Sequence, residues 1–489
     1  MNETHPDARA RTRVVAGLLL FSLVAVACGQ KPGVHQEIAV GIGSGGDFVA
    51  GEEDFDPGTL TDPDGLLDPD STSLDGGTQG GSSGGGGTSG AGSTGGGTTA
   101  TTAPTGGGGG GGGGGSATPS GTDRTGVTAD SLTVAVHAPV TGAAPLPVTS
   151  FEEAADLYWR WQIEEKQNPI LGRTKVNVVF KDDKYQPSTA VQACRELAAS
   201  AFLLVGGGGT DQIQACGRFA EQARVPYLSA GVTEAGLRGL QWYFATSMSY
   251  AQQGPVLAQF VKKTFPSKKV AMIVTDTPNF DDAVQGWESG VASQGIDYYK
   301  TLKHTKGDTS WINSFGSELR SNGVEVVYIL TAPVDYIRFA QQNSGDFQYV
   351  GVGISMGLNA VLGSGCPHVD GGIFFSPAPG LDWVRENEPD FFASAQKFNA
   401  PADDIGYLLW GNAKVQHEMF KRYAGVYGND LTREDFRAVL EQQQNLTTKT
   451  FPPLSYSPQD HFGGSQIQVL QGNCGAEEYQ TLETFKSGF

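Results

Sequence analysis

The chain has 489 residues, 70 of them glycine, and a formal net charge of −19. Binding to nucleic acid calls for a basic face, so this acidic balance argues against nucleic acid as a partner. The glycines and much of the acidic charge lie before about residue 125. This distribution predicts a long polar spacer, followed by a folded part that is only mildly acidic.

The N-terminal segment has the layout of an export signal. Basic residues precede an apolar run over residues 14–27, which ends in small residues before Cys28. A run of about 14 residues is shorter than the ~20 that a helix needs to cross the hydrocarbon core. A cysteine in this position resembles the lipobox of bacterial lipoproteins, in which that cysteine is cut free and acylated. We therefore expect a signal peptide over residues 1–27, and a mature chain anchored by lipid at Cys28 to the outer face of the cytoplasmic membrane. The alternative is an ordinary cleaved signal in which Cys28 is incidental.

Residues 28–125 consist mostly of Gly, Ser, Thr, Asp and Pro, with an unbroken glycine run over 106–115. Such a segment lacks the apolar surface that would offset the entropy of ordering it, so we expect a disordered linker. A flexible chain of this length spans about 50–60 Å. The acidic stretch 62–70 has some likeness to calcium loops, but it lacks their ligand spacing and closing Glu. We therefore interpret it as solvated spacer.

From about residue 126 the pattern changes to apolar strands that alternate with amphipathic helices. Continuous apolar strands separated by helices of 10–15 residues predict a parallel sheet covered on both faces. About 360 residues are too many for one core of this kind, so two lobes are expected. The expected strands are residues 131–137, 175–180, 202–205, 226–229, 269–275, 296–299, 324–330, 348–352 and 465–470. The expected helices are residues 151–165, 188–198, 212–222, 281–294, 310–321, 336–343, 405–423 and 433–443.

Four cysteines remain if Cys28 carries lipid, an even number in a compartment where disulfides persist. Cys194 and Cys216 lie on successive helices that flank one strand, and a right-handed crossover places such helices side by side. We expect this local pair, which leaves Cys366 and Cys474 for each other, although three pairings are possible in principle. The clustered Cys/His spacing of a metal site is absent, so we expect no metal and no cofactor.

Two loops at strand ends are candidates for ligand binding. In parallel α/β sheets, ligands lie beyond the carboxyl ends of the strands, where loops lead into helix N-termini. The glycine turn 206–209 precedes Thr210 and a helix, so its N–H groups and the helix dipole favour an anion. The loop 229–233 presents a second such set. Each loop by itself also fits ordinary turn glycines and caps. The absence of a following Gly-Lys-Ser/Thr argues against a nucleotide P-loop.

Several short segments follow one another in a specific order along the folded part. They are Lys181-Asp182-Asp183, Pro187, Ala190-Val191, residues 206–209, residues 225–229, Phe244-Ala245-Thr246-Ser247, Gln252-Gln253-Gly254, Asp308-Thr309-Ser310 and residues 454–461. Their order resembles type 1 periplasmic binding proteins of the leucine/isoleucine/valine-binding group, and the likeness covers nearly all of residues 126–489. The resemblance implies an α/β fold of two doubly wound, Rossmann-like lobes that are joined by three hinge crossings and trap a ligand between them.

The matching segments put the crossings near residues 245–249, 370–375 and 454–457. Lobe 1 would then cover about residues 126–246 and 375–454, and lobe 2 about residues 247–374 and 455–489. In the family, the two glycine-containing loops hold the carboxylate of the ligand through backbone amides and hydroxyls. The corresponding residues of this chain are Gly209, Thr210, Ser229, Gly231 and Thr233.

The second half of the site departs from the family pattern. Relatives have a tyrosine at the position where this chain has Phe280. They also have an acidic residue at a position near Gly353 of this chain, which has no acid there. A bound ammonium needs acceptors or a compensating charge, so the loss of that acid weighs against an amino-acid ligand. Asp276, Asp281 and Tyr336 could replace it, although each could also be a helix cap or a surface residue. We expect a small carboxylate-bearing ligand, an amino acid or a related organic acid.

Catalysis finds little support, because the sequence has neither a Gly-x-Ser-x-Gly elbow nor a zinc signature. The resemblance implies that the protein captures a solute and delivers it to a membrane permease with a cytoplasmic ATPase, as in amino-acid transport. The alternative is a sensor or scaffold of the cell envelope with the same fold, whose partner is a receptor or a cell-wall enzyme. The long spacer slightly favours this alternative, because a permease lies at the membrane and requires little reach. The family resemblance favours delivery to a permease, which is the function we expect.

Overall fold

The computed structural model describes residues 117–353 and 357–486. The expected signal peptide, Cys28 and the linker up to residue 116 lie outside the described residues. None of the described helices combines the length and the apolar character that a membrane span requires.

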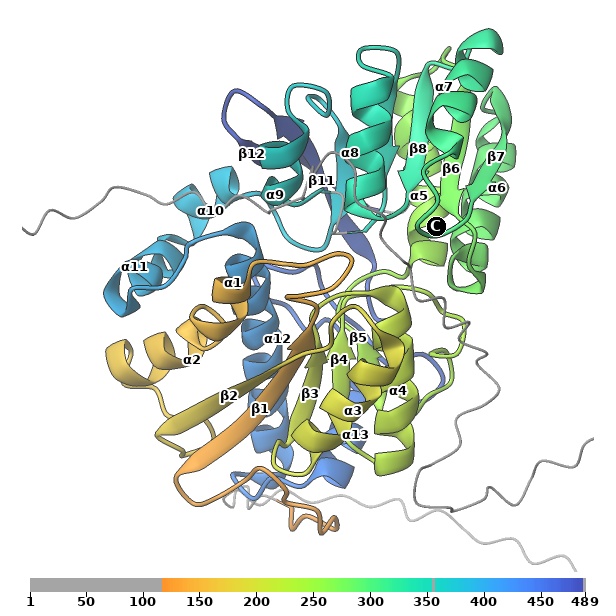
Figure 1. Ribbon diagram of the computed structural model, residues 1–489. Helices are drawn as coiled ribbons and strands as arrows, with labels where there is room; N and C mark the ends of the chain where they lie inside the picture. Colours follow the sequence, from red (N-terminus) through yellow and green to blue (C-terminus); the bar gives the residue numbers. More distant parts are fainter. Residues whose placement is uncertain (1–116, 354–356, 487–489) are drawn as a thin grey trace, which may run out of the picture. The chain divides into compact units, whose positions relative to one another are not determined.

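The first sheet has five strands in the order β2-β1-β3-β4-β5, and all neighbours are parallel. These strands are β1 (Ser131–Ala138), β2 (Lys175–Asp182), β3 (Leu203–Gly206), β4 (Tyr227–Ser229) and β5 (Tyr243–Ala245). Helices cover both faces (Figure 1). They are α1 (Val148–Glu152), α2 (Leu157–Arg160), α3 (Pro187–Ala198), α4 (Thr210–Ala223), α12 (Asp404–Tyr427) and α13 (Arg433–Leu440).

Alternation along the strands divides this lobe into two cores. Leu132 and Val134 of β1 pack in a cluster with residues of α12 and α13. The neighbouring Ala135 points to the opposite face and packs with residues of α3 and α4. Successive side chains of a strand point to opposite faces, so a strand covered on both sides must be apolar at every position. The uninterrupted apolar runs of the sequence reflect this burial.

The second sheet has seven strands in the order β12-β11-β10-β9-β8-β6-β7. Its strands are β6 (Val270–Thr275), β7 (Tyr298–His304), β8 (Val326–Leu330), β9 (Gln348–Gly351), β10 (Ile373–Ser376), β11 (Gln466–Asn473) and β12 (Glu478–Lys486). The pairs from β6 to β10 are parallel, whereas β11 pairs antiparallel with both β10 and β12. Its helices are α5 (Tyr250–Thr264), α6 (Asp281–Gln294), α7 (Trp311–Ser321), α8 (Pro333–Gln342) and α9 (Asn359–Gly365). Two further helices, α10 (Leu381–Asn387) and α11 (Pro389–Phe398), follow β10.

This architecture confirms the predicted fold class of two α/β lobes. Among the details that differ from the expectation, two concern segments named in the sequence analysis. The segment 370–375, expected as a crossing, contains most of β10, so the chain leaves the second sheet only after Ser376. The single helix expected over residues 151–165 is divided into α1, α2 and a π-helical turn, Trp161–Glu165. The assignment of residues to the two lobes stays a prediction.

Both expected disulfides are present. Cys194–Cys216 joins α3 to α4, and Cys366–Cys474 joins the end of α9 to the turn between β11 and β12. The second bond links residues that are 108 positions apart. Closing a loop of this length restricts the unfolded chain strongly, so this bond is expected to contribute more stability than the local one.

The chain is attached to the first lobe before residue 126, where the folded part was expected to begin. Ser120 Oγ and the Gly121 amide both donate to the carboxylate of Asp435 on α13. Arg433, at the start of α13, is 3% exposed and donates to Asp123 and to backbone carbonyls at the end of α3 and just before β3, those of Ala198, Ala201 and Phe202. The expected linker, which ended at residue 125, is therefore too long, because these bonds fix the chain to the first lobe from Ser120 onward.

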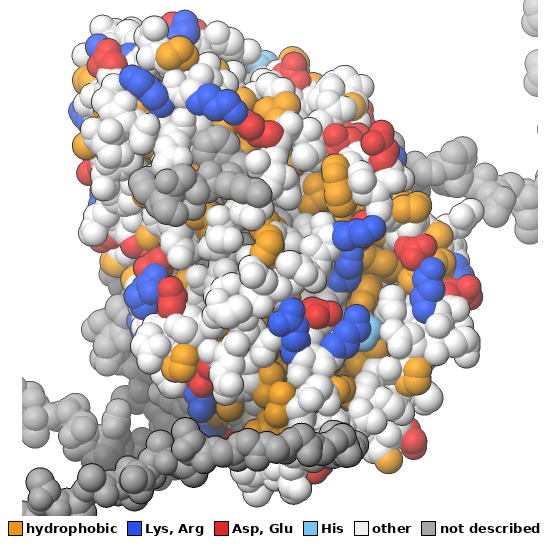
Figure 2. All heavy atoms as spheres, turned by 180° about the vertical axis from the view of Figure 1, so that it is seen from behind, with side chains coloured by type: hydrophobic (Ala, Val, Ile, Leu, Met, Phe, Trp, Pro, Cys, Tyr) orange, Lys and Arg blue, Asp and Glu red, His pale blue; other side chains and the backbone are white. Residues whose placement is uncertain are grey.

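Acidic and basic side chains are interspersed on the face shown in Figure 2. Ion pairs such as Lys268–Glu325 are half-exposed. Exposed pairs of this kind contribute about 0–1 kcal/mol each. The stability of the fold therefore depends on the two buried cores and on buried polar groups such as Arg433.

We predict that Arg433→Met lowers the free energy of unfolding by about 3 kcal/mol, because it leaves buried carbonyl groups and Asp123 without their charged donor. Arg437→Met is the matched control, since Arg437 lies one turn later on α13 and is partly exposed. This control should cost less than about 1 kcal/mol. Urea denaturation of both variants measures the difference, and equal losses would contradict the role assigned to Arg433.

Candidate ligand-binding cavity

A cavity of about 210 Å³ lies where the carboxyl ends of the two sheets face each other. Its wall includes residues that follow β3 and β4 in the first lobe and residues that follow β6 and β8 in the second. Most of the wall is apolar, and it includes Leu146, Phe151, Ile213, Phe280, Leu330 and Phe375. This position is the one at which parallel α/β folds bind small molecules.

The glycine turn of the first lobe lies in the cavity wall, together with the start of α4. Gly209 has a φ of 75°, and a Cβ at this position would lie 2.0 Å from the side-chain oxygen of Gln212. Gly209 supplies no capping side chain, and the first N–H groups of a helix have no partner within the helix. Thr210 adds a hydroxyl to the same part of the wall. Gly209 and Thr210 thus lie where an anion could accept these hydrogen bonds.

The loop 229–233 was expected to hold the carboxylate of the ligand, but most of its polar groups are bonded to other protein groups. Gly231 lies in the wall, but its amide donates to Ser247 Oγ at 2.8 Å. A Cβ on Gly231 would lie 2.2 Å from the carbonyl oxygen of Met248, so glycine is required here for close packing. Ser229 and Thr233 are fully buried and do not line the cavity. Their hydroxyls are engaged by protein groups, Ser229 with the Ala230 carbonyl and Thr233 with Asp282.

Of the residues expected from the second lobe, Phe280 lines the cavity, and its ring centroid lies 5.9 Å from that of Tyr250. Asp276 does not reach the cavity, since its side chain is 60% exposed and pairs with Lys303. Asp281 pairs with the same lysine. Tyr336 is buried in the core against Tyr349 and Phe374.

Tyr336 is turned away because α8 begins at Pro333, three residues earlier than expected. The helix therefore directs Tyr336 into the core, whereas the preceding Asp335 lines the cavity.

The structure adds wall residues that the sequence interpretation did not identify. They are Tyr250, Gln253, Thr275, Thr331, Asp335 and Lys306. Tyr250 begins α5. The sequence pattern that could have located this helix start is the capping box formed by Ser249 and Gln252. Burial raises the pKa of Tyr250 to about 12, although a hydrogen bond with Thr210 opposes this shift. Tyr250 is therefore a neutral hydroxyl beside Thr210.

Hydrogen bonds across the gap hold the two lobes together. Asp282 of α6 accepts from the Glu234 amide and from the Thr233 hydroxyl, both in the first lobe. Lys306, in the second lobe, lies 3.1 Å from Asp211 at the start of α4. Figure 1 shows α4 and α6 on the different lobes that these contacts connect.

Asp404, at the start of α12, makes a further bond between the lobes. Its carboxylate accepts from the Asn359 amide at the start of α9, at 2.7 Å. Burial is the largest cause that raises the pKa of Asp404 to about 7, and the nearby Asp403 acts in the same direction. The folded protein therefore binds a proton at Asp404 more tightly than an exposed aspartate would.

This shift predicts that Asp404 destabilises the fold as the pH rises from about 4 to 7, because the folded state must then release a proton that the unfolded state has already lost. The loss is at most about 4 kcal/mol, at 1.36 kcal/mol per pKa unit. Asp404→Asn, which cannot titrate, should gain stability relative to the wild type between pH 5 and pH 8. Thermal unfolding at the two pH values measures this gain.

Asp390→Asn alters a half-exposed acid and serves as the control. A constant difference between Asp404→Asn and the wild type would contradict the assignment.

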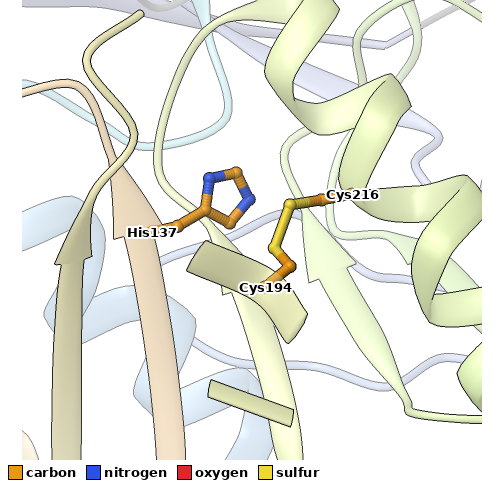
Figure 3. A group of neighbouring side chains, drawn as sticks. All are labelled: His137, Cys194 and Cys216. Carbon is orange, nitrogen blue, oxygen red and sulfur yellow. A yellow bond between two sulfur atoms is a disulfide. The ribbon is translucent and has the colours of Figure 1, made fainter. Parts of the chain in front are cut away.

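His137 lies beside the Cys194–Cys216 disulfide, and these three residues are of metal-ligating types (Figure 3). Both sulfur atoms are bonded to each other. The ring nitrogens of His137 lie 2.8 Å from Asp183 and 2.7 Å from the Tyr227 hydroxyl. All the ligating atoms are thus already engaged, and we interpret this buried cluster as structural.

Comparisons with known proteins agree with this geometry. The profile of the family described as periplasmic binding protein matches residues 131–477. The Leu/Ile/Val-binding protein homolog 3 of Brucella melitensis is 27% identical over 202 residues, which cover 40% of this chain and 53% of that protein. The aligned segment thus spans only about half the length of this relative.

Two solved structures share the fold. One is a branched chain amino acid ABC transporter protein from Thermus thermophilus with bound valine, with 14% identity and a TM-score of 0.59; the match covers 74% of this chain and 98% of that chain. The other is a solute binding protein of an ABC transporter from Rhodopseudomonas palustris in complex with 3,4-dihydroxybenzoic acid, with 16% identity and a TM-score of 0.58; it covers 73% and 98%. From the extent of the profile match and the two-lobed fold, we conclude that the chain belongs to the periplasmic binding protein family, whose members bind solutes and are not enzymes.

Proposed function

We propose that this protein is an extracytoplasmic, lipid-anchored solute-binding protein that captures a small carboxylate-bearing ligand between its two lobes. The carboxylate of the ligand would accept hydrogen bonds from Thr210 and from the first N–H groups of α4. The apolar wall, with Phe280, would hold the body of the ligand. The proposal keeps the predicted signal peptide over residues 1–27 and the acylated Cys28.

The observation that carries this proposal is the start of α4 in the wall of a mostly apolar cavity between the two sheets. A helix N-terminus favours negative charge by about 0.3–1 kcal/mol at exposed sites and by more where water is excluded. The apolar remainder of the wall favours a ligand with a hydrocarbon body. Valine and 3,4-dihydroxybenzoic acid, which two proteins of this fold bind, are both small carboxylic acids with such a body.

We further propose that the loaded protein delivers its ligand to an ABC-type permease and its ATPase. Hinge closure of two lobes around a ligand creates a shape that a membrane partner can distinguish from the empty, open form. The bonds that Asp282 and Asp404 make across the gap support such a closed form. The lobe that contains the first sheet would move against the lobe that contains the second sheet.

A matched ligand panel tests the capture of a carboxylate. Leucine, benzoate and hexanoate would be titrated into the purified protein by calorimetry, beside leucinamide, benzamide and hexanamide, which lack the carboxylate. We expect at least one acid to bind and its amide to bind at least tenfold more weakly. Equal binding of an acid and its amide, or no binding by any acid, would contradict the proposal.

We predict that Thr210→Val weakens the binding of the acid found in this panel by about 1–3 kcal/mol, because a hydrogen bond to a charged group is lost. This cost corresponds to a roughly 5- to 150-fold higher Kd. The control is Thr189→Val, in the first turn of α3 and outside the cavity wall. Calorimetry with both variants measures the effect. Unchanged affinity in Thr210→Val would mean that the carboxylate binds elsewhere.

A further inference from the structure

The second-lobe wall of the cavity contains a polar cluster that the proposed function does not use. It consists of Thr275, His304, Thr331 and Asp335, at the carboxyl ends of β6, β7 and β8 and in the first turn of α8. Thr275, Thr331 and Asp335 line the cavity. All four residues are buried, and Asp335 is 6% exposed.

The hydrogen bonds of His304 identify which of its nitrogens accepts. Nδ1 lies 3.1 Å from the carbonyl oxygen of Thr305, which can only accept, so Nδ1 carries a hydrogen. Burial lowers the pKa of His304, which keeps the ring neutral. Nε2 is therefore an acceptor, and it lies 2.9 Å from Thr331 Oγ1 and 3.3 Å from Thr275 Oγ1.

The cluster offers few donors to the Asp335 carboxylate. Two hydroxyl hydrogens, one on Thr275 and one on Thr331, serve both the His304 nitrogen and Asp335. Thr331 lies 2.9 Å from His304 and 3.4 Å from Asp335, and Thr275 lies 3.3 Å from His304 and 3.0 Å from Thr331. Even when Thr275 serves the histidine, Asp335 receives only the long bond from Thr331. The carboxylate is left with one long contact within the cluster.

A buried carboxylate with too few donors is costly unless another group supplies them. Burial raises the pKa of Asp335, and His304 and Arg338 oppose this rise without cancelling it. The position of Asp335 in the first turn of α8 is also favourable for an acid. A place in the first turn of a helix does not by itself require the Asp335 carboxylate to face the cavity. The exposed Asp276, also at a strand end of the second lobe, faces solvent instead.

We propose that Asp335, with Thr331 and Thr275, binds a hydrogen-bond-donating group on the part of the ligand that faces the second lobe. This inference rests on the proposed function, in which the first lobe holds the carboxylate. The ligand class is then an organic acid with an apolar body and a hydroxyl or ammonium group distant from its carboxylate. Simple aliphatic and aromatic acids without such a group leave Asp335 without donors and bind more weakly.

Matched pairs of acids test this assignment by calorimetry. Benzoate is compared with 4-hydroxybenzoate, and hexanoate with 6-aminohexanoate, so that the first pair tests a hydroxyl and the second an ammonium group. We expect the donor-bearing member of at least one pair to bind the wild-type protein at least tenfold more tightly. In Asp335→Ala this ratio should fall below about threefold. Asp276→Ala, which removes an acid of the same lobe outside the cavity, should keep the wild-type ratio.

The outcomes separate this inference from the function on which it rests. If the acids bind but neither pair shows a preference for the donor, or if Asp335→Ala keeps the wild-type ratio, the inference is wrong and carboxylate capture stands. If none of the four acids binds, the inference is contradicted, and carboxylate capture is contradicted as well if leucine also fails to bind. Thr331→Val provides a second test if Asp335→Ala unfolds. Loss of the Thr331 hydroxyl should also reduce the ratio, and an unchanged ratio in this variant would overturn the inference.

Discussion

Two carboxylates, Asp282 and Asp404, connect the lobes by accepting hydrogen bonds from backbone amides on the other side of the gap. These bonds help to hold the carboxyl ends of the two sheets close to each other around the cavity. Each bond removes a charged group from solvent, and burial raises the pKa of both aspartates. The hydrogen bonds between the lobes favour closure, whereas the removal of the two carboxylates from water opposes it. A small ligand can shift this balance toward the closed form through its own contacts with both walls.

The two contacts proposed for the ligand are of opposite kinds. The first lobe supplies donors, namely the first N–H groups of α4 and the Thr210 hydroxyl. The second lobe supplies acceptors around Asp335, and the surface between them is mainly apolar. A ligand bound across such a cavity has a fixed orientation, because its acidic end and its donor end cannot exchange places without leaving charged groups unpaired. Parallel sheets that meet at their carboxyl ends place strand ends and helix N-termini on both sides of the cavity.

The sequence predicted the fold well, because β1, β3, β6 and β8 are buried on both faces and appear as continuous apolar runs. It also located Gly209 and Thr210, since a glycine turn between a strand and a helix is a local pattern. The second wall could not be predicted in this way. Whether Asp335 or Tyr336 faces the cavity depends on where α8 begins, and a shift of one residue rotates a helix by about 100°. The engagement of Thr233 with Asp282 depends on the closure of the lobes, which no local pattern specifies.

A crystal structure of the protein with a carboxylate ligand, either copurified or soaked, tests the central claim most directly. The account predicts a closed pair of lobes with the ligand in the cavity and its carboxylate within hydrogen-bonding distance of Thr210 and the first N–H groups of α4. A ligand bound outside this cavity, or one whose carboxylate faces the second lobe, would contradict it.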